Sequence, residues 1–233
     1  MHFMSQQKAT MSLRSSLSLP ALLSVLVLTA TAATAQVRIT EVAPWSSGNS
    51  VVGADWFELT NMGSSAVDIT GWKVDDNSNS FASSLALSGV SSIGAGRSVI
   101  FIEGNATTAS NFLNNWFGSA SYAGVVVGTY SGAGIGLGAG GDAVNIFNAA
   151  GALQARVDFG VSDAVSPFQT FDNSAGLNNA TLSTLSAAGT NGAFVIASGV
   201  EIGSPSLVPE PETYAMLLAG LGLVGAAIRR RQA

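Results

Sequence analysis

The sequence predicts an all-β protein, an antiparallel β-sandwich, and three observations predict it. Short apolar runs alternate with polar residues at the period of two that marks a half-buried strand. Turn residues, chiefly glycine, asparagine, aspartate and serine, interrupt these runs about every dozen residues, as they do between the strands of a sandwich. The chain has 233 residues, 47% of them hydrophobic, and no cysteine, so a core of ordinary size must hold the fold without disulfides.

The first predicted strand begins at Val37. Val37 and Ile39 fall on one face of this strand, and Arg38 and Thr40 fall on the other. By the same alternation Glu41 falls on the Val37 face, so we expect an inward-facing carboxylate there.

The next predicted strand, residues 55–61, carries Trp56 and is closed by a turn at 61–65. Short strands at 67–74 follow, with Trp72 among them. Both tryptophans stand in strand context, so we expect them in the core.

A single helix is predicted, after a buried strand at 99–102. Thr107 or Thr108 is the expected N-cap, and Gly118 is the expected end. An apolar stripe at helical spacing should pack this helix over one end of the sandwich; its members are Phe112, Leu113, Trp116 and Phe117.

A glycine-rich run at 132–141 contains the spacing G-x-G-x-x-G. We reject a dinucleotide site and expect no cofactor, because residues 142–147 alternate like a strand and do not open a helix. A hairpin connection at 148–151 leads to a returning strand at 153–159. The pattern weakens over 161–206, and this extension is expected to pack on the sandwich because it lacks the apolar residues of a separate core.

Several spaced motifs stand in order between residues 36 and 160. They begin at Ile39 (I-x-E-V), Asp55 (D-W-F-E-L-x-N) and Val67 (V-D-I-x-G-W), with further matches at 93–101 and 141–147. Together they resemble the lamin-tail domain, an immunoglobulin-like sandwich, and the predicted helix reads as an insertion into it. The resemblance implies a non-catalytic module of the kind that bacterial secreted or surface proteins carry.

Residues 1–35 have the features of a secretory signal peptide, with a charged start and an apolar centre. Ala33 and Ala35, before Gln36, make the small-x-small cleavage pattern; an uncleaved membrane anchor is the alternative. Cleavage would remove His2, the sole histidine of the sequence. Histidine triads and histidine-bound zinc are therefore excluded from the mature protein.

Residues 207–233 have three parts: the motif Pro209, Glu210 and Pro211, an apolar run at 213–228, and the cluster Arg229, Arg230 and Arg231. The run is expected to form a transmembrane helix, and the arginines favour a cytoplasmic end. This arrangement resembles the PEP-CTERM sorting signal of Gram-negative bacteria that make exopolysaccharide. The resemblance implies an exosortase that recognises the Pro-Glu-Pro motif and removes the helix. A plain single-pass anchor is the alternative.

The chain between these two end segments is acidic. Residues 36–207 contain four basic and twelve acidic side chains, a difference of −8. Such a surface repels phosphate backbones, so we expect no direct binding of nucleic acid.

Glu41 and Glu58 are the remaining candidates for chemistry, as an acid and base pair in glycoside hydrolysis. We favour a structural interpretation, in which both accept hydrogen bonds from loop amides and pair with Arg38, Arg97 or Arg156. No catalytic residue is therefore assigned. Both acids facing each other in an open cleft would reverse this interpretation.

Two further groups of residues are candidate ligand sites. Asp75, Asn77 and Asn79 place oxygens at alternate positions, as calcium loops do, but the sixth residue is Ser80 where an EF-hand has glycine. A polar turn is the favoured interpretation, and no metal is assigned. Trp45 stands in a loop and is the candidate for stacking on a saccharide.

The expected function is non-enzymatic adhesion or scaffolding within exopolysaccharide or biofilm, by a protein of the cell envelope or extracellular matrix. The expected partners are signal peptidase, exosortase and matrix components, with the inner membrane only during export. Two alternatives are a carboxylate-dependent hydrolase of matrix polymers and an accessory module that recruits a secreted nuclease or glycan enzyme.

Overall fold

The computed structural model of the chain describes residues 37–46, 50–119, 122–162, 165–206 and Leu221. The predicted signal peptide and its cleavage site lie outside these residues, as do the Pro-Glu-Pro motif, the arginine cluster and all of the predicted transmembrane helix except Leu221. Within the described part of the chain, no helix has the length and apolar character needed to cross a membrane.

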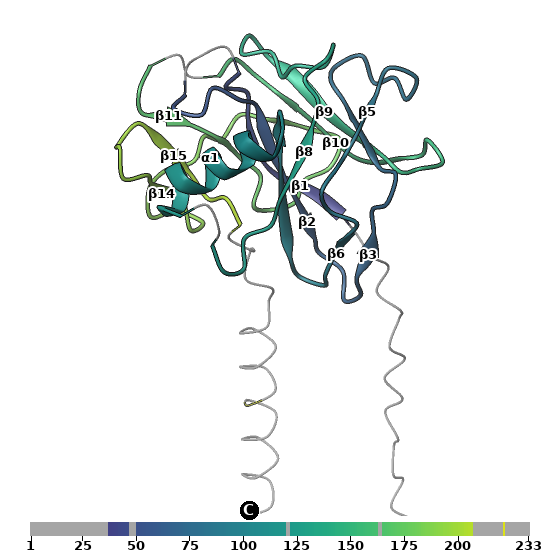
Figure 1. Cartoon of the computed structure of the whole chain (residues 1–233), viewed down its shortest axis with the longest axis horizontal. Helices are drawn as coiled ribbons and strands as arrows, with labels where there is room; N and C mark the ends of the chain where they lie inside the picture. The colour runs from purple at the N-terminus through teal and green to yellow at the C-terminus, as the bar shows by residue number, and fades with distance from the viewer. Residues whose placement is uncertain (1–36, 47–49, 120–121, 163–164, 207–220, 222–233) are drawn as a thin grey trace, which may run out of the picture. The chain divides into compact units, whose positions relative to one another are not determined.

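Two five-stranded sheets dominate the described residues (Figure 1). The first sheet has the order β12-β1-β2-β7-β8, and its strands are β1 (Val37–Ala43), β2 (Trp56–Asn61), β7 (Ser98–Glu103), β8 (Val127–Tyr130) and β12 (Phe171–Asp172). The second sheet has the order β13-β10-β9-β4-β5, with β4 (Lys73–Asp75), β5 (Leu85–Ala86), β9 (Asp142–Phe147), β10 (Leu153–Phe159) and β13 (Ala180–Leu182). Pairing in both sheets is antiparallel, as predicted, except at one edge of each sheet, where β8 runs parallel to β7 and β13 runs parallel to β10.

Within the described residues, the remaining strands are two or three residues long, and one helix accompanies them. β3 (Val67–Asp68) pairs with β6 (Ser92–Ile93), and a three-stranded sheet has the order β11-β15-β14, with β11 (Phe168–Gln169), β14 (Phe194–Val195) and β15 (Glu201–Gly203). The helix α1 spans Ala106–Phe117. The segment after residue 160 therefore adds a strand to each large sheet, β12 beside β1 and β13 beside β10.

The inner core forms between the two large sheets. Alternate side chains of both sheets meet there, among them Ile39, Phe57, Leu59 and Phe101 from the first sheet and Val74, Val144, Ile146 and Val157 from the second. Phe57 lies 5.8 Å from Phe101 and 5.6 Å from Tyr130, between ring centroids. The predicted sandwich is therefore confirmed, with one short helix added to it.

The first sheet is also covered on its other face. A second group of buried side chains, here called the outer cluster, joins this face to α1 and the later segments; it contains Ala43, Trp45, Ala54, Trp56, Ile100, Ile102, Phe112, Trp116 and Ile196. All six residues of β2 are buried as a result. The sequence prediction placed the helix over one end of the sandwich; instead it lies against a face, because Trp56 is edge-to-face with both Phe112 and Trp116 of α1.

Different interactions fix the two ends of α1. Asn105, and neither Thr107 nor Thr108, is the N-cap, because its side-chain oxygen accepts hydrogen bonds from the amides of those two threonines. The Asn105 amide in turn donates to the hydroxyl oxygen of Thr108, which completes a capping box. Gly118 ends the helix as predicted, with a φ of 71° that glycine adopts without a steric penalty.

A β-bulge in β1 decides which way Glu41 faces. Ile39 pairs with Leu59, but the next pair is Glu41 with Glu58, so Thr40 is the extra residue. Glu41 is buried, as predicted, but it faces the outer side of the first sheet and not the inner core that holds Val37 and Ile39. Simple alternation is wrong at this position because it does not allow for the inserted residue.

Candidate functional site

Two glutamates lie opposite each other on adjacent strands of the first sheet. Glu41 on β1 and Glu58 on β2 are cross-strand partners, and they are only 1% and 2% exposed. The chain that encloses them is the closing segment, defined here as residues 201–206, which carries β15 and reaches the pair from far along the sequence.

The Glu41 carboxylate anchors the middle of the closing segment. Its Oε1 accepts a hydrogen bond from the Ser204 amide at 2.7 Å and another from the Thr170 hydroxyl at 2.5 Å. Gly203 passes so close that a Cβ there would stand 2.7 Å from the same oxygen and 3.0 Å from Trp116. A side chain larger than hydrogen at this position would push the closing segment off the sheet.

The Glu58 carboxylate anchors the end of the same segment. Its Oε2 accepts from the Ser206 amide at 2.5 Å, and its Oε1 accepts from the Thr40 hydroxyl at 2.6 Å. Thr60 joins this network and lies 2.6 Å from Ser98, between their hydroxyl oxygens. A row of hydroxyl groups on the outer face of the sheet therefore supplies donors that water would otherwise supply.

Burial raises the pKa of both acids. The pKa of Glu41 rises from its ordinary 4.5 to about 8, first because of burial and second because of the charge of Glu58. Burial raises the pKa of Glu58 to about 7, partly offset by the hydroxyl and amide donors around it. The pair therefore keeps a proton at neutral pH, since two ionised carboxylates enclosed side by side repel each other.

Other acidic side chains also join distant segments. Glu201 accepts from the Val51 amide at 2.7 Å, and Asp55 accepts from the amides of Ser46 and Leu137, each at 2.7 Å. Burial raises the pKa of both Glu201 and Asp55. These acids act as acceptors for the loops that cover the first sheet, which is a structural use of carboxylates.

The structure distinguishes between the two sequence interpretations of Glu41 and Glu58. Loop amides do bind both acids, as the structural interpretation expects. The expected pairing with arginines is wrong: in the described residues the ion pair formed is Arg156 with Asp158, at 2.5 Å. Neither glutamate lines the two surface cavities of about 720 and 280 Å³ that adjoin Arg97. A polymer chain therefore has no route to the acids through these cavities.

The candidate calcium loop begins at Asp75, whose carboxylate already accepts hydrogen bonds from neighbouring residues. Asp75 is fully buried and accepts from the Ser78 hydroxyl at 2.7 Å, the Ser80 amide at 2.6 Å and the Ser83 hydroxyl at 3.1 Å. Asn79 adopts a φ of 49°, which closes the turn. No group of three or more histidine, cysteine or acidic side chains is placed to hold a metal ion within the described ranges. Calcium binding stays a hypothesis, and titration calorimetry at millimolar calcium tests it.

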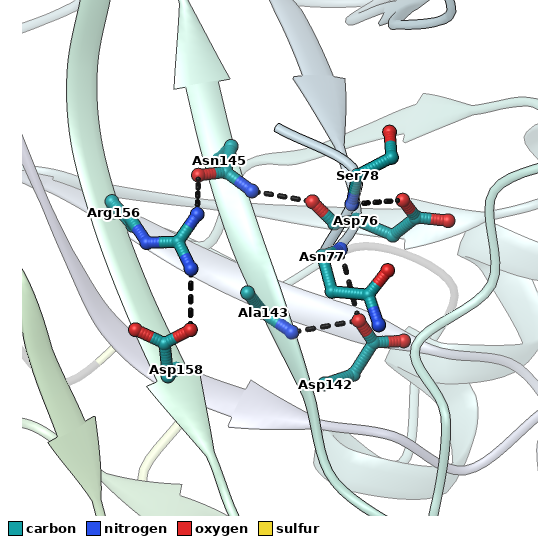
Figure 2. A network of polar contacts seen from close by, with 8 residues as sticks. All are labelled: Asp76, Asn77, Ser78, Asp142, Ala143, Asn145, Arg156 and Asp158. Atoms are coloured by element: carbon teal, nitrogen blue, oxygen red, sulfur yellow. Dashed lines mark hydrogen bonds and ion pairs between the residues drawn. The ribbon is translucent and has the colours of Figure 1, made fainter. Parts of the chain in front are cut away.

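A polar network fixes the same turn to the second sheet (Figure 2). Asp142 accepts from the amides of Asn77, at 2.9 Å, and of Ala143, at 2.8 Å. Asn145 donates to the backbone carbonyl of Asp76 and accepts from Arg156, at 2.7 Å. The network therefore braces the turn after β4 against β9 and β10.

Trp45 does not stand at the surface. It is 1% exposed and packs edge-to-face against Trp56, with 6.0 Å between ring centroids, inside the outer cluster. This position does not offer a ring face to a sugar, because the side chain is enclosed by other aromatic groups. Trp56 and Trp72 are buried, as expected.

A cavity that the sequence analysis did not predict lies beside α1. It measures about 720 Å³ and lies between the C-terminal end of α1, residues 122–125, Phe194, and Pro205 with Ser206 of the closing segment. Arg97 also lines it, as it does a neighbouring cavity of about 280 Å³. No local pattern predicts this site, because its residues come from distant parts of the chain.

These observations define a β-sandwich in which the buried acids accept hydrogen bonds from the segments that cover the first sheet. A family model for the Lamin Tail Domain matches residues 30–160, so the chain belongs to that family. A second model, for the PEP-CTERM protein-sorting motif, matches residues 207–231. A search of the curated proteins found no matching relative.

The two matches have a functional consequence for the whole chain. The sorting motif marks a protein that is exported across the membrane of a Gram-negative bacterium to its envelope or surface and is processed by an exosortase. Both matched types are non-catalytic. The chain is thus an exosortase-sorted, exported lamin-tail protein.

Proposed function

We propose that this protein is a non-enzymatic adhesion or scaffolding module of the extracellular matrix or cell surface, working within exopolysaccharide or biofilm. Signal peptidase removes residues 1–35 between Ala35 and Gln36. The segment 213–228 crosses the inner membrane during sorting, and exosortase acts at the motif that begins at Pro209. The sandwich, with residues 161–206 packed on it, is what reaches the matrix.

The observation that carries this proposal is the enclosure of Glu41 and Glu58. General acid and base catalysis needs both groups within reach of a substrate. Here the closing segment lies against both acids, and its backbone amides occupy one oxygen of each. The domain then contributes a surface and not a reaction, which suits adhesion or scaffolding better than hydrolysis.

The charge of the domain supports the same proposal. The difference of −8 between basic and acidic side chains keeps an exported protein soluble and disfavours nucleic acid as a direct partner. A role as an accessory to a nuclease or glycan enzyme would need a separate partner protein, and a pull-down from isolated matrix tests for one.

The test combines fractionation with an activity screen. The producing bacterium is made to express the wild-type chain or a variant with Pro209→Ala and Pro211→Ala, and the matrix, membrane and medium are separated. We expect the wild-type protein in the matrix or surface fraction and the variant retained in the membrane, because the sorting motif is lost. Deleting the gene should weaken cohesion of the matrix.

The purified chain is then incubated with the isolated matrix glycans. We expect no new reducing ends. If reducing ends appear with the wild-type chain and disappear with Glu58→Gln, the protein is a hydrolase and the proposal is wrong. If matrix cohesion is the same without the protein, the scaffolding role is wrong.

A further inference from the structure

The cavity beside α1 combines the size of a ligand site with a lining free of acidic side chains. It is large enough for a small ligand, since typical binding cavities measure about 300–1,000 Å³. None of its lining residues is acidic, although twelve acidic side chains lie between residues 36 and 207. An anionic group can therefore enter here without direct repulsion from the lining.

The wall of the cavity presents an aromatic ring to solvent. Tyr122 stacks on Phe117 with 4.8 Å between ring centroids and an interplanar angle of 24°. Tyr122 is nevertheless 51% exposed, so about half of the residue remains accessible to solvent. An exposed aromatic ring supported from behind is a surface on which the C–H groups of a sugar ring pack, because those hydrogens meet the negative face of the ring.

Arg97 supplies a positive charge at the cavity. The other three cations of the domain are engaged: Arg156 pairs with Asp158, Lys73 lies 4.6 Å from the ring centre of Phe81, and Arg38 donates to the carbonyl of Val37. The guanidinium of Arg97 has no partner among the described residues, and its side chain is exposed. A guanidinium binds a carboxylate through two parallel hydrogen bonds.

We infer that the cavity beside α1 binds glycans that carry carboxylate groups, with Tyr122 stacking on a sugar ring and Arg97 binding the carboxylate of a uronic acid. This inference rests on the proposed matrix function and names the ligand class of that function. Arg97 and Gly124 line both cavities, so the two cavities adjoin and together offer room for an oligosaccharide.

The test uses the full chain in mild detergent and titration calorimetry with an oligogalacturonate. The matched probe is the methyl ester of the same oligosaccharide, which keeps the sugar rings and removes the charge. We expect the acid to bind about tenfold or more tightly than the ester, since a charge-assisted pair is lost in the ester. Arg97→Gln should weaken binding of the acid to the level of the ester.

Variants at the ring complete the test. Tyr122→Ala should weaken binding of both probes, whereas Tyr122→Phe should retain binding because the ring remains. Lys73→Gln, which removes a surface cation outside the cavity, should bind like the wild type. Thermal unfolding of each variant checks that the fold is intact.

Three results would overturn the inference: no binding of the acid by the wild-type chain, equal binding of acid and ester, or unchanged binding by Arg97→Gln. These are distinguishable from failure of the proposed function. A wild-type chain that stays in the matrix but binds no oligogalacturonate keeps its scaffolding role and loses this site.

Discussion

The two faces of the first sheet are both buried, yet they carry different kinds of side chain. The inner face packs mostly aliphatic and phenyl side chains against the second sheet. The outer face is aromatic at one end, where Trp56 meets Trp45, Phe112 and Trp116 at 5.4 to 6.0 Å. At its other end the outer face is polar, with threonine, serine and glutamate side chains in one hydrogen-bonded network.

The difference teaches how the outer face became enclosed. Antiparallel sheets commonly have one apolar and one solvated face, and the polar end of this outer face has the residues of a solvated one. The closing segment lies beyond the residues that match the Lamin Tail Domain, and its amides take the place of water on Glu41 and Glu58. Enclosure of a polar surface is what raises the pKa values there.

The largest effect should follow a change in the inner core. Phe101→Ala removes a fully buried ring that stacks on Phe57, and we expect a loss of about 3–5 kcal/mol in the free energy of unfolding. Urea denaturation measures it. Val195→Ala, at a side chain that is 44% exposed on β14, is the control and should change stability by about 0.5 kcal/mol or less. Similar losses in the two variants would mean that the inner face is not the main source of stability.

The second-largest effect is a pH dependence of stability that arises from the two glutamates of the outer face. The pKa values of Glu41 and Glu58 rise on folding from 4.5 to about 8 and about 7, so the folded protein binds more protons than the unfolded chain between those values. The contribution of these two protonated acids to the free energy of unfolding is therefore fully present below about pH 4.5. It is lost as the pH rises from there through the folded-state pKa values of about 7 and about 8, a loss on the order of a few kcal/mol.

Chemical denaturation between pH 5 and pH 9 measures this loss. The double variant Glu41→Gln and Glu58→Gln should show a much flatter profile, with a smaller residual slope from Asp55 and Glu201, whose pKa values are also raised. A wild-type protein that becomes more stable from pH 5 to pH 9 would show that the acids are not enclosed as described.

The smallest effect concerns the cap of α1, which covers the outer face. Asn105→Ala removes the acceptor for the amides of Thr107 and Thr108, and we expect a loss of about 1 kcal/mol. Thermal unfolding measures the loss, and hydrogen exchange should be faster at those two amides. Asn111→Ala, at an exposed position in the middle of the same helix, is the matched control. Equal exchange rates in the two variants would argue against the capping box.

Much of the local structure could be predicted from the sequence. The alternation of Val37 and Ile39, the strand at 142–147 and the stop at Gly118 depend on neighbours only a few residues away, and the structure has them as predicted. The bulge at Thr40 could not be predicted in this way, because an inserted residue shows itself only through the partner strand.

The candidate site was harder to predict for the same reason. Trp45 stands among loop residues in the sequence and becomes a core residue once Trp56 and Phe168 pack around it. Arg97 and Tyr122 are far apart in the chain and have no shared pattern, so their meeting at one cavity is a property of the fold. The arginine pairing expected for the two glutamates failed because nearer amides and hydroxyls occupy them.

The sequence by itself determined the strand periodicity, the helix and its end, and the two matched motifs that make this an exported and sorted chain, because each is written in short contiguous stretches. Only the tertiary structure decided that Glu41 and Glu58 are enclosed and that a cavity opens beside α1. The amides that bind the two acids come from Ser204 and Ser206, more than a hundred residues later in the chain. Whether a carboxylate is solvated or buried depends on what covers its face of the sheet, and no local pattern carries that information.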